Sequence, residues 1–508
     1  MSKSKCRKLE KQRERSIKRK KEINEGKLIA VEYEERKKKH AIPNRLNGAN
    51  TAAEELAQRQ DTAEKATAAY RQMLPELLLN LNKIKDPRKP ERVKHKMTVV
   101  MAYGILLFVF HTGSRRNANK TLSCPIFFEN LNTMFPELKT LPHADTLARL
   151  LERIDAEEIQ ASMILLIKEL IRKKKFQNYL IRKRYLIAVD GTQKFYRDYK
   201  WDEHCLKRKV GGDDIKTEQF YVYVLESVLI LDNGITLPLM SIFVKNEGYI
   251  EGTTKQDCEQ KAFKRLAKKL KQEFPKTRIS LVMDGLYACG PIIQICKKND
   301  WDFMIVLKED SLKEVWREAI GLMRLDPENS LKVFWGEHTQ EYSWANDIEY
   351  EYGENGRYKQ ILNVVICYEN WTVNHINSSK KVEEMNTRYA WISSKKIHEK
   401  NVFSRCTKMG RFRWCIENNI LTEKHQGYEY EHCYSYSWNA MEGFHYLMKI
   451  GRLLNVLAVN STALVEKVRT LGIRGFISHF KLACSGCLLN LGRIATVVAN
   501  KSSWRLVS

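Results

Sequence analysis

The segment YLIAVDG, residues 185–191, decides the fold of this chain, because it places a short apolar strand directly before an Asp-Gly pair. A second segment of the same kind, ISLVMDG, covers residues 279–285. One such pair is more often a simple turn than a site. Two of them favour a site, since a strand end presents its last side chain at the rim of a sheet. Asp190 and Asp284 are therefore candidate catalytic carboxylates.

The residues around these segments alternate between strand and helix patterns. Apolar runs predict further strands at residues 220–231, 237–244 and 303–307, with a turn at Gly234. Amphipathic spacing predicts helices at residues 254–274 and 290–297. The order β-β-β-α-β-α-β is that of a ribonuclease-H-like α/β core, in which the ends of the first and fourth strands lie side by side.

A third carboxylate is expected from a helix after the last strand. The spacing Arg413-x3-Glu417-x6-Lys424 puts the three side chains within about 40° of one another on a helix of 3.6 residues per turn. The alternative is an ordinary ion pair between Arg413 and Glu417 on a solvated face. With Asp190 and Asp284 already in place, we favour Glu417 as catalytic and Arg413 and Lys424 as phosphate-binding residues.

Three clustered carboxylates repel one another, so the cluster implies bound cations. Magnesium prefers oxygen ligands and accepts carboxylates together with substrate phosphate, and we expect manganese to substitute for it. Two such ions can stabilise the attacking and leaving oxygens of a displacement at phosphorus. No nucleotide cofactor is expected, because the sequence contains no Gly-x4-Gly-Lys-Ser/Thr loop.

The formal net charge of +26 over 508 residues predicts a nucleic-acid partner. An anionic membrane is the alternative. The longest apolar run, residues 97–110, is shorter than the roughly 20 residues of a spanning helix, so we expect a buried core helix and no membrane contact. The basic N-terminus has no apolar segment behind it and does not resemble a secretory signal.

The chain is expected to contain several domains. Asn355-Gly356 predicts a hairpin turn in the β-rich part. The predicted parts are a basic arm, disordered or a solvated helix, at 1–42; a helical domain that binds DNA ends at 43–180; the first part of the core at 181–329; a β-rich insertion at 330–396; the last part of the core with the catalytic helix at 397–455; and a helical region at 456–508.

Cys484 and Cys487 are expected to be buried thiols on a C-terminal helix, with zinc binding as the alternative.

At this point the sequence resembles the DDE transposases of bacterial insertion sequences, in the group marked by the signature Tyr-x2-Arg-x3-Glu-x6-Lys. The resemblance covers about residues 185–454, and its motifs are AVDGT at 188–192, LVMDG at 281–285 and the spacing around Glu417. It implies metal-dependent cut-and-paste transposition, in which a freed 3′-hydroxyl attacks target DNA. It also implies double-stranded DNA partners, a homodimer on DNA and a cytoplasmic, nucleoid-associated location.

The sequence departs from the signature at one position, where Gly410 replaces the tyrosine. Tyr428 is a candidate replacement. The resemblance further makes Tyr389 and Trp391 candidates for stacking on a flipped base, and the alternative is that they pack the core of the insertion. Residues 438–444 also resemble the family, but without an assignable role.

Two other functions remain open. The chain could be a metal-dependent nuclease of the same fold that does not join strands. It could also be a catalytically silent, transposase-derived DNA-binding protein. Intact Asp190, Asp284 and Glu417 argue against the silent form.

Overall fold

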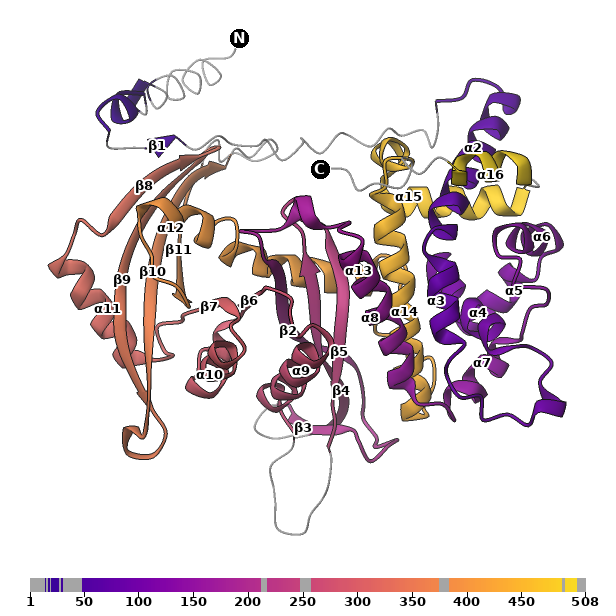
Figure 1. The fold of residues 1–508 in the computed structure, drawn as a ribbon, viewed down its shortest axis with the longest axis horizontal. Helices are drawn as coiled ribbons and strands as arrows, with labels where there is room; N and C mark the ends of the chain where they lie inside the picture. The colour runs from indigo at the N-terminus through magenta and orange to yellow at the C-terminus, as the bar shows by residue number, and fades with distance from the viewer. Residues whose placement is uncertain are drawn as a thin grey trace. The chain divides into compact units, whose positions relative to one another are not determined.

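The computed structural model describes residues 14, 17–18, 20–26, 29–30, 48–211, 217–246, 257–373, 383–486 and 489–499. The chain divides into two compact units (Figure 1). Unit 1 comprises Met1–Lys39 and Arg278–Arg413, and unit 2 comprises His40–Thr277 and Trp414–Ser508. Most of the predicted basic arm lies outside the described residues.

Unit 2 combines an antiparallel sheet with many helices. Its strands are β2 (Tyr185–Arg197), β3 (Leu206–Val210), β4 (Thr217–Ile230) and β5 (Thr236–Val244). Its α-helices are α2 (Ala52–Arg71), α3 (Leu74–Leu81), α4 (Met97–Val109), α5 (Arg115–Leu122), α6 (Pro125–Met134), α7 (Ala144–Leu151), α8 (Ala156–Arg172), α9 (Glu259–Glu273), α13 (Trp414–His425), α14 (Trp438–Val459), α15 (Val465–Gly486) and α16 (Leu491–Ala499).

The sheet of unit 2 is covered on both faces. β4 pairs with β2 along one side and with β3 and β5 along the other. Opposite residues of an antiparallel pair share a face, and one face carries Asp190, Glu226 and Ser241 and is covered by α14. The other face carries Tyr223, whose hydroxyl donates to Glu259 of α9 over 2.8 Å. Because helices cover both faces, β5 is buried along most of its length.

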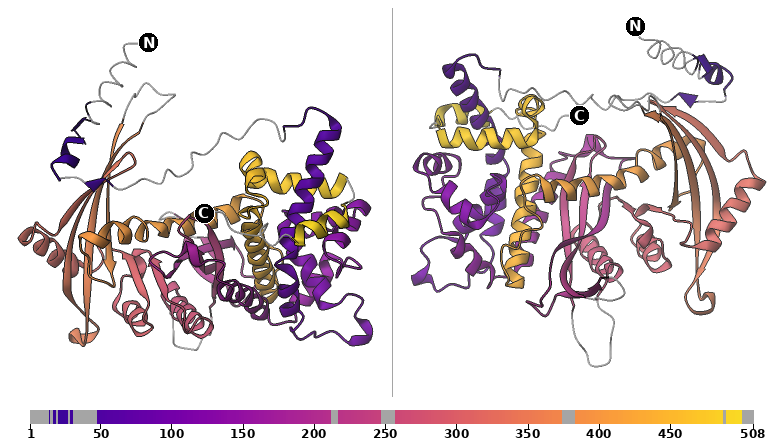
Figure 2. Two further views of the ribbon diagram at one scale, coloured as in Figure 1. Left: turned by 45° about the horizontal axis from the view of Figure 1, so that its top comes forward. Right: turned by 180° about the vertical axis from the view of Figure 1, so that it is seen from behind.

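The helix α4 confirms the prediction of a buried core helix over residues 97–110. All but one of its 13 residues are buried, as expected for a helix that is apolar on every side. It packs against α14, which stands between the sheet and the N-terminal helices α2 to α7 (Figure 2). A Cβ atom at Gly451 of α14 would lie 2.8 Å from Phe108 Cβ, so glycine permits this close approach. Among the described residues, no helix is both long and apolar enough to cross a membrane.

Unit 1 is a β-rich sheet with a few helices. Its strands are β1 (Ile29–Ala30), β6 (Ile279–Met283), β7 (Asp302–Val306), β8 (Ser330–Trp335), β9 (His338–Tyr352), β10 (Tyr358–Val373) and β11 (Glu383–Ser393). Its α-helices are α10 (Gly290–Lys298), α11 (Lys313–Leu325) and α12 (Glu399–Cys406). Within this unit the strand order is β1-β8-β9-β10-β11-β7-β6. β6 and β7 are parallel, whereas β11 pairs antiparallel with β7.

A buried ion pair holds α12 to this sheet. The Arg405 guanidinium donates to both carboxylate oxygens of Asp302 over 2.9 and 3.0 Å, and the two side chains are 1% and 5% exposed. The same guanidinium donates to the hydroxyl of Ser393 at the end of β11. Because Asp302 begins β7, one side chain joins α12, β7 and β11.

Most predicted elements are confirmed, with changes at their ends. The helix predicted from residue 254 begins at Glu259, and residues 254–256 lie outside the described residues. The hairpin turn at Asn355-Gly356 joins β9 to β10, and both residues have positive φ angles. The helical domain has a break between α2 and α3, and Pro75 occupies the first turn of α3, where a backbone N–H would have no partner within the helix. The charged strand β3 was not predicted.

Candidate active site

Asp190 lies in the middle of a strand, so the prediction that its strand ends there is wrong. The apolar pattern stops at Val189, but residues 191–197 continue to pair with β4 as far as Phe220. The backbone ladder therefore extends beyond the apolar run. Asp190 nevertheless marks a change in burial, because residues 186–189 are buried and Asp190 and Gly191 are partly exposed.

Opposite Asp190, the carboxylate of Glu226 is the centre of a buried polar network. Glu226 is 1% exposed and accepts hydrogen bonds from Ser241, over 2.7 Å, and Tyr430, over 2.8 Å. Lys449 Nζ of α14 lies 2.9 Å from Glu226 and 2.6 Å from Glu423 of α13. This network joins the strand opposite Asp190 to both α13 and α14.

Charge pairing decides the protonation of the network. Burial alone would raise the pKa of Glu226, but the charge of Lys449, together with hydrogen bonds from His445 and Ser241, outweighs it and holds that pKa well below its usual range. Burial would likewise lower the pKa of Lys449, yet Glu226 and Glu423 raise it. Burial lowers the pKa of His445 to about 3, so this imidazole is neutral at pH 7.

Lys194 lies in the same buried region. Its Nζ donates to the carbonyl of Tyr430 over 2.7 Å. Burial, followed by the charge of Lys449, lowers the pKa of Lys194 to about 7. Beside it lies a cavity of about 570 Å³ lined by residues 193–198 and Glu431.

Asp284 is in unit 1 and directly follows β6, as predicted. Its side chain accepts from the amide of Gly285, and it is 33% exposed. Lys308 Nζ lies 3.7 Å from Asp284 Oδ1. Sequence reasoning missed Lys308, although its place just after β7 was a usable signal: β7 runs parallel to β6, so residues that follow both strands emerge at one edge of the sheet.

Glu417 lies on α13, which packs against β2 in unit 2. The structure therefore brings the helix that carries Glu417 to the strand that carries Asp190. Arg413 ends a 3-10 turn, Gly410–Arg413, just before α13, so it does not share the α-helical face on which its predicted alignment depended. Lys424 is on α13, and its Nζ lies 2.9 Å from Glu431 Oε1.

The neighbourhood of Gly410 in unit 1 accounts for the departure from the signature. A Cβ atom at Gly410 would lie 2.9 Å from Trp391 Nε1, so an indole fills the space that a larger side chain would need. Trp391 is 3% exposed and stacks on Tyr389, with ring centroids 5.6 Å apart. Tyr389 is partly exposed, and the Arg411 guanidinium lies 5.0 Å from its ring centre.

Tyr428 is unsuited to replace the signature tyrosine in this conformation. It is fully buried in unit 2 and accepts a hydrogen bond from the Asn455 amide over 2.9 Å. Its ring also packs edge-on against His111. These contacts give Tyr428 a place in the core of the helical region.

Residues 438–444 have a structural role, which the sequence did not reveal. The Asn439 amide donates to the carbonyl of Leu151, the last residue of α7, over 2.7 Å and to that of Ile154 over 2.6 Å. Glu442 accepts from the Trp438 indole over 2.7 Å and pairs with Lys245 over 2.8 Å. The start of α14 is thereby fixed both to the N-terminal helices and to the residue after β5.

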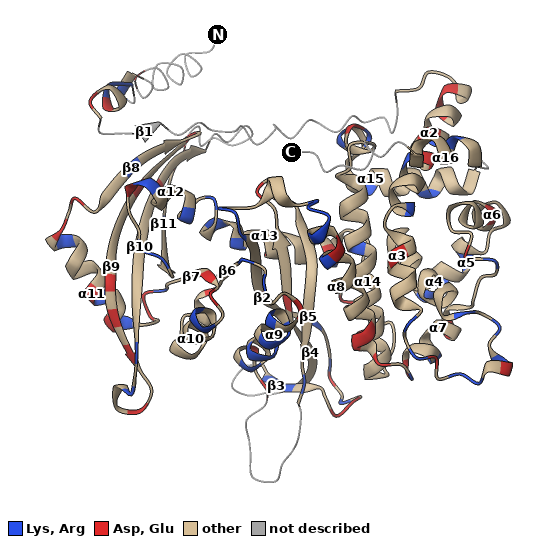
Figure 3. Cartoon of the chain, in the orientation of Figure 1, with Lys and Arg blue, Asp and Glu red and all other residues tan. Residues whose placement is uncertain are grey.

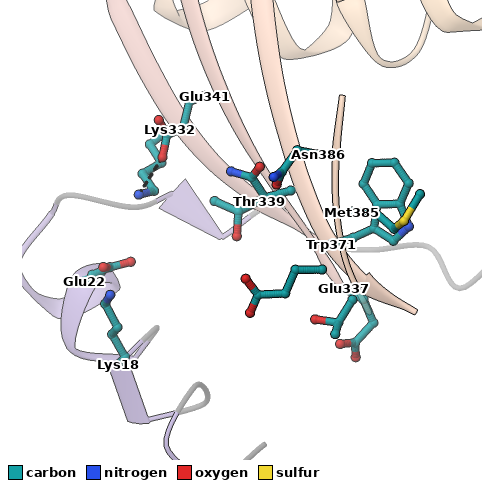
Figure 4. Close-up of a pocket in the computed structure, with 12 residues that line it drawn as sticks. Lys18, Glu22, Lys332, Glu337, Thr339, Glu341, Trp371, Met385 and Asn386 are labelled. Atoms are coloured by element: carbon teal, nitrogen blue, oxygen red, sulfur yellow. Dashed lines mark ion pairs between the residues drawn. The ribbon is translucent and has the colours of Figure 1, made fainter. Parts of the chain in front are cut away.

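A second cavity, of about 410 Å³, lies in unit 1 between the strands of the insertion and the N-terminal residues Lys18 and Glu22 (Figure 4). Its lining includes the carboxylates of Glu337, Glu341 and Glu384. The lining also includes Lys18 and Lys332, so acidic and basic side chains are mixed there.

Two findings concern metals. Over the described ranges, no three Asp, Glu, His or Cys side chains are grouped closely enough to hold a metal ion in this conformation. Cys484 is a buried thiol on α15, as predicted, and Cys487 lies outside the described residues.

Comparison with known protein families associates part of the chain with one of them. Residues 78–166 match the model of a family described as DDE_Tnp_1-associated. The matched segment extends from α3 into α8 and contains none of Asp190, Asp284 and Glu417. No curated protein matches the chain. The family match associates the chain broadly with the DDE-type transposases, a group of DNA-processing enzymes.

Proposed function

We propose that this protein is a transposase that moves an insertion sequence by metal-dependent strand cleavage and strand transfer. The observation that carries the proposal is that two separate parts of the chain indicate the same group. The family match is confined to residues 78–166. The carboxylate motifs that resemble a DDE transposase begin only at residue 188.

The secondary structure supports a ribonuclease-H-like core for this enzyme. Unit 2 contributes the antiparallel strands β2, β4 and β5 followed by α9. Unit 1 contributes β6, α10 and β7, in which the two strands are parallel. This is the predicted order of elements, with β3 added between the first two strands.

The proposed metal ligands are Asp190, Asp284 and Glu417, with magnesium as the natural ion and manganese as its substitute. Carboxylate oxygens suit these hard cations. Bound metal would stabilise the attacking and leaving oxygens at phosphorus. The packing of α13 on β2 and the place of Asp284 just after β6 support the assignment.

Basic side chains near the carboxylates are proposed to bind DNA phosphates. Arg413 can bind a phosphate through two parallel hydrogen bonds from its planar guanidinium, whereas Lys424 and Lys308 act as point charges. Lys424 must then exchange its ion pair with Glu431 for the phosphate. Tyr389 is the better candidate for stacking on a base, because Trp391 is buried.

The substrates are proposed to be double-stranded transposon ends and a double-stranded target, bound by a homodimer. The net charge of +26 supports a nucleic-acid partner. Two ends must be held together for a concerted reaction, which is the reason for the dimer. The helical region that contains residues 78–166 is proposed to recognise the ends.

The test uses purified full-length protein and labelled duplexes from the DNA that flanks its gene, with magnesium present. Wild type should nick the end and join it to a second duplex. Asp190→Asn, Asp284→Asn and Glu417→Gln should each bind DNA normally but lose at least about 100-fold in cleavage. Glu318→Gln, an exposed residue of α11, is the matched control and should remain active.

The alternatives give different results in the same assay. Cleavage without joining would identify a metal-dependent nuclease, and binding without cleavage would identify a silent DNA-binding derivative. Full activity of Asp190→Asn would show that the active site lies elsewhere. Paired inverted repeats on both sides of the gene would favour the transposase over both alternatives.

A further inference from the structure

The exposed face of α9 carries a straight row of lysines. Lys261, Lys264 and Lys268 are exposed, and their three- and four-residue spacing places them on one face of the helix. The opposite face is apolar and packs on the sheet through residues such as Phe263 and Leu266. Figure 3 shows the concentration of basic residues on this helix. We call the three residues the α9 lysine row.

Other charged residues of α9 have partners within unit 2. Arg265 pairs with Asp257 over 2.6 Å, and Lys269 pairs with Glu157 of α8. The two acidic residues, Glu259 and Glu273, bond to Tyr223 and Lys168. In the described part of the chain, no carboxylate forms an ion pair with the three lysines of the row. Their charge is therefore available to an external anion.

The helix α9 begins against β2, the strand that carries Asp190. A Cβ atom at Gly191, next to Asp190, would lie 2.5 Å from Glu259 Oε2. Glu259 is the first residue of α9 and lies two positions before Lys261. Asp190 itself faces α14 on the other side of the sheet, so DNA bound along the row would lie on the face opposite to the Asp190 side chain.

We propose that the α9 lysine row binds the phosphate backbone of duplex DNA without regard to sequence. The inference rests on the proposed function and adds a surface for non-specific or target DNA. From Lys261 to Lys268 the helix rises about 10 Å at about 1.5 Å per residue. That length matches roughly three base-pair rises of about 3.4 Å along the axis of the duplex.

The chemistry of the row favours DNA backbone over other partners. No large hydrophobic side chain of α9 is exposed, so the face lacks the apolar anchors of a protein interface. It also lacks an exposed arginine, the residue that commonly reads guanine. Flexible lysines make point-charge contacts with phosphate, which position DNA but do not read its sequence.

The test measures binding of a random-sequence duplex at several salt concentrations by fluorescence anisotropy. The variant carries Lys261→Gln, Lys264→Gln and Lys268→Gln. The control carries Lys298→Gln, Lys313→Gln and Lys400→Gln, which remove three exposed charges from unit 1 and so match the loss of net charge. A second variant replaces the three lysines of the row with arginine and keeps the charge.

The slope of log binding constant against log salt should fall by about 2–3 in the glutamine variant, since each phosphate contact contributes roughly 0.9. Its affinity at 0.1 M salt should fall at least tenfold. The control and the arginine variant should keep the wild-type slope. Equal salt slopes for the glutamine variant and the control would overturn the proposal that the α9 lysine row binds DNA. If wild type binds no duplex at all, the proposed function itself fails.

Discussion

Lys449→Met tests whether the buried network opposite Asp190 stabilises the folded chain. The lysine lies 2.9 Å from Glu226 and 2.6 Å from Glu423, and the three side chains are no more than 2% exposed. Methionine has a similar length but no charge, so the substitution removes the cation with little change in volume. Two buried carboxylates would then face each other without their shared partner.

The expected loss is large. At about 2.9 Å and an effective dielectric constant near 20, one such pair is worth roughly 5–6 kcal/mol before desolvation is counted. Removal of one partner from a buried pair typically costs about 3–5 kcal/mol. We expect a loss of about 4 kcal/mol, or about 8 °C in the thermal midpoint if each kcal/mol shifts it by roughly 2 °C.

The assay is thermal unfolding at several pH values. In wild type the pKa of Glu226 is held low, so this carboxylate contributes stability above the ordinary pKa of a glutamate, and that contribution is lost as the pH falls. In Lys449→Met the unpaired carboxylates should protonate instead. The difference between the two midpoints should therefore shrink between pH 7 and pH 5.

A compensated variant makes the test specific. Lys449→Met combined with Glu226→Gln and Glu423→Gln removes all three charges, and replacing a whole buried ion pair is often close to neutral. At least half of the lost stability should return. A midpoint for Lys449→Met within about 2 °C of wild type at pH 7 would refute the reasoning.

Three further predictions concern stability. The pKa of Lys194 in the folded chain is about 7, so the unfolded chain binds one more proton than the folded chain between pH 7 and about 10. The thermal midpoint of wild type, relative to that of Lys194→Met, should therefore rise by about 4 °C from pH 7 to pH 9. A constant difference between the two midpoints would contradict this. Gly451→Ala should lower the midpoint, at a cost of about 1–3 kcal/mol, because its Cβ would meet Phe108, whereas Gly321→Ala, with nothing within 4 Å, should not. Arg405→Met should cost about 3–5 kcal/mol in urea unfolding, because it leaves Asp302 buried without its partner, and Asp302→Asn in the same chain should restore part of the loss.

The sequence predicted best the elements whose patterns are local. The strands β5 and β6 and the helix α10 were located almost to the residue, because each apolar run is bounded by glycine, aspartate or a break in spacing. The charged strand β3 carried no such pattern, since pairing with β4 rather than apolar burial holds it in the sheet. Asp190 was misplaced at a strand end for the same reason: backbone pairing continued beyond the apolar side chains.

The candidate site was only partly predictable. Asp190, Asp284 and Glu417 could be proposed from motifs, because each lies in a short recognisable stretch. Glu226 could not, because its importance depends on neighbours distant in the sequence, whereas Lys308 was missed although its place after β7 was a signal. The side chain that fills the space beside Gly410 belongs to Trp391, 19 positions earlier in the chain, and no pattern around either residue reveals that contact.

The pairing of β11 with β7 has a consequence for engineering the β-rich insertion. Deleting residues 330–396 would remove β11 and strip β7 of its hydrogen-bonding neighbour on that side. An exposed strand edge invites pairing with other chains. A shortened protein should therefore aggregate even though every proposed metal ligand is retained. The insertion thus covers an edge of the sheet that the rest of the chain cannot leave exposed.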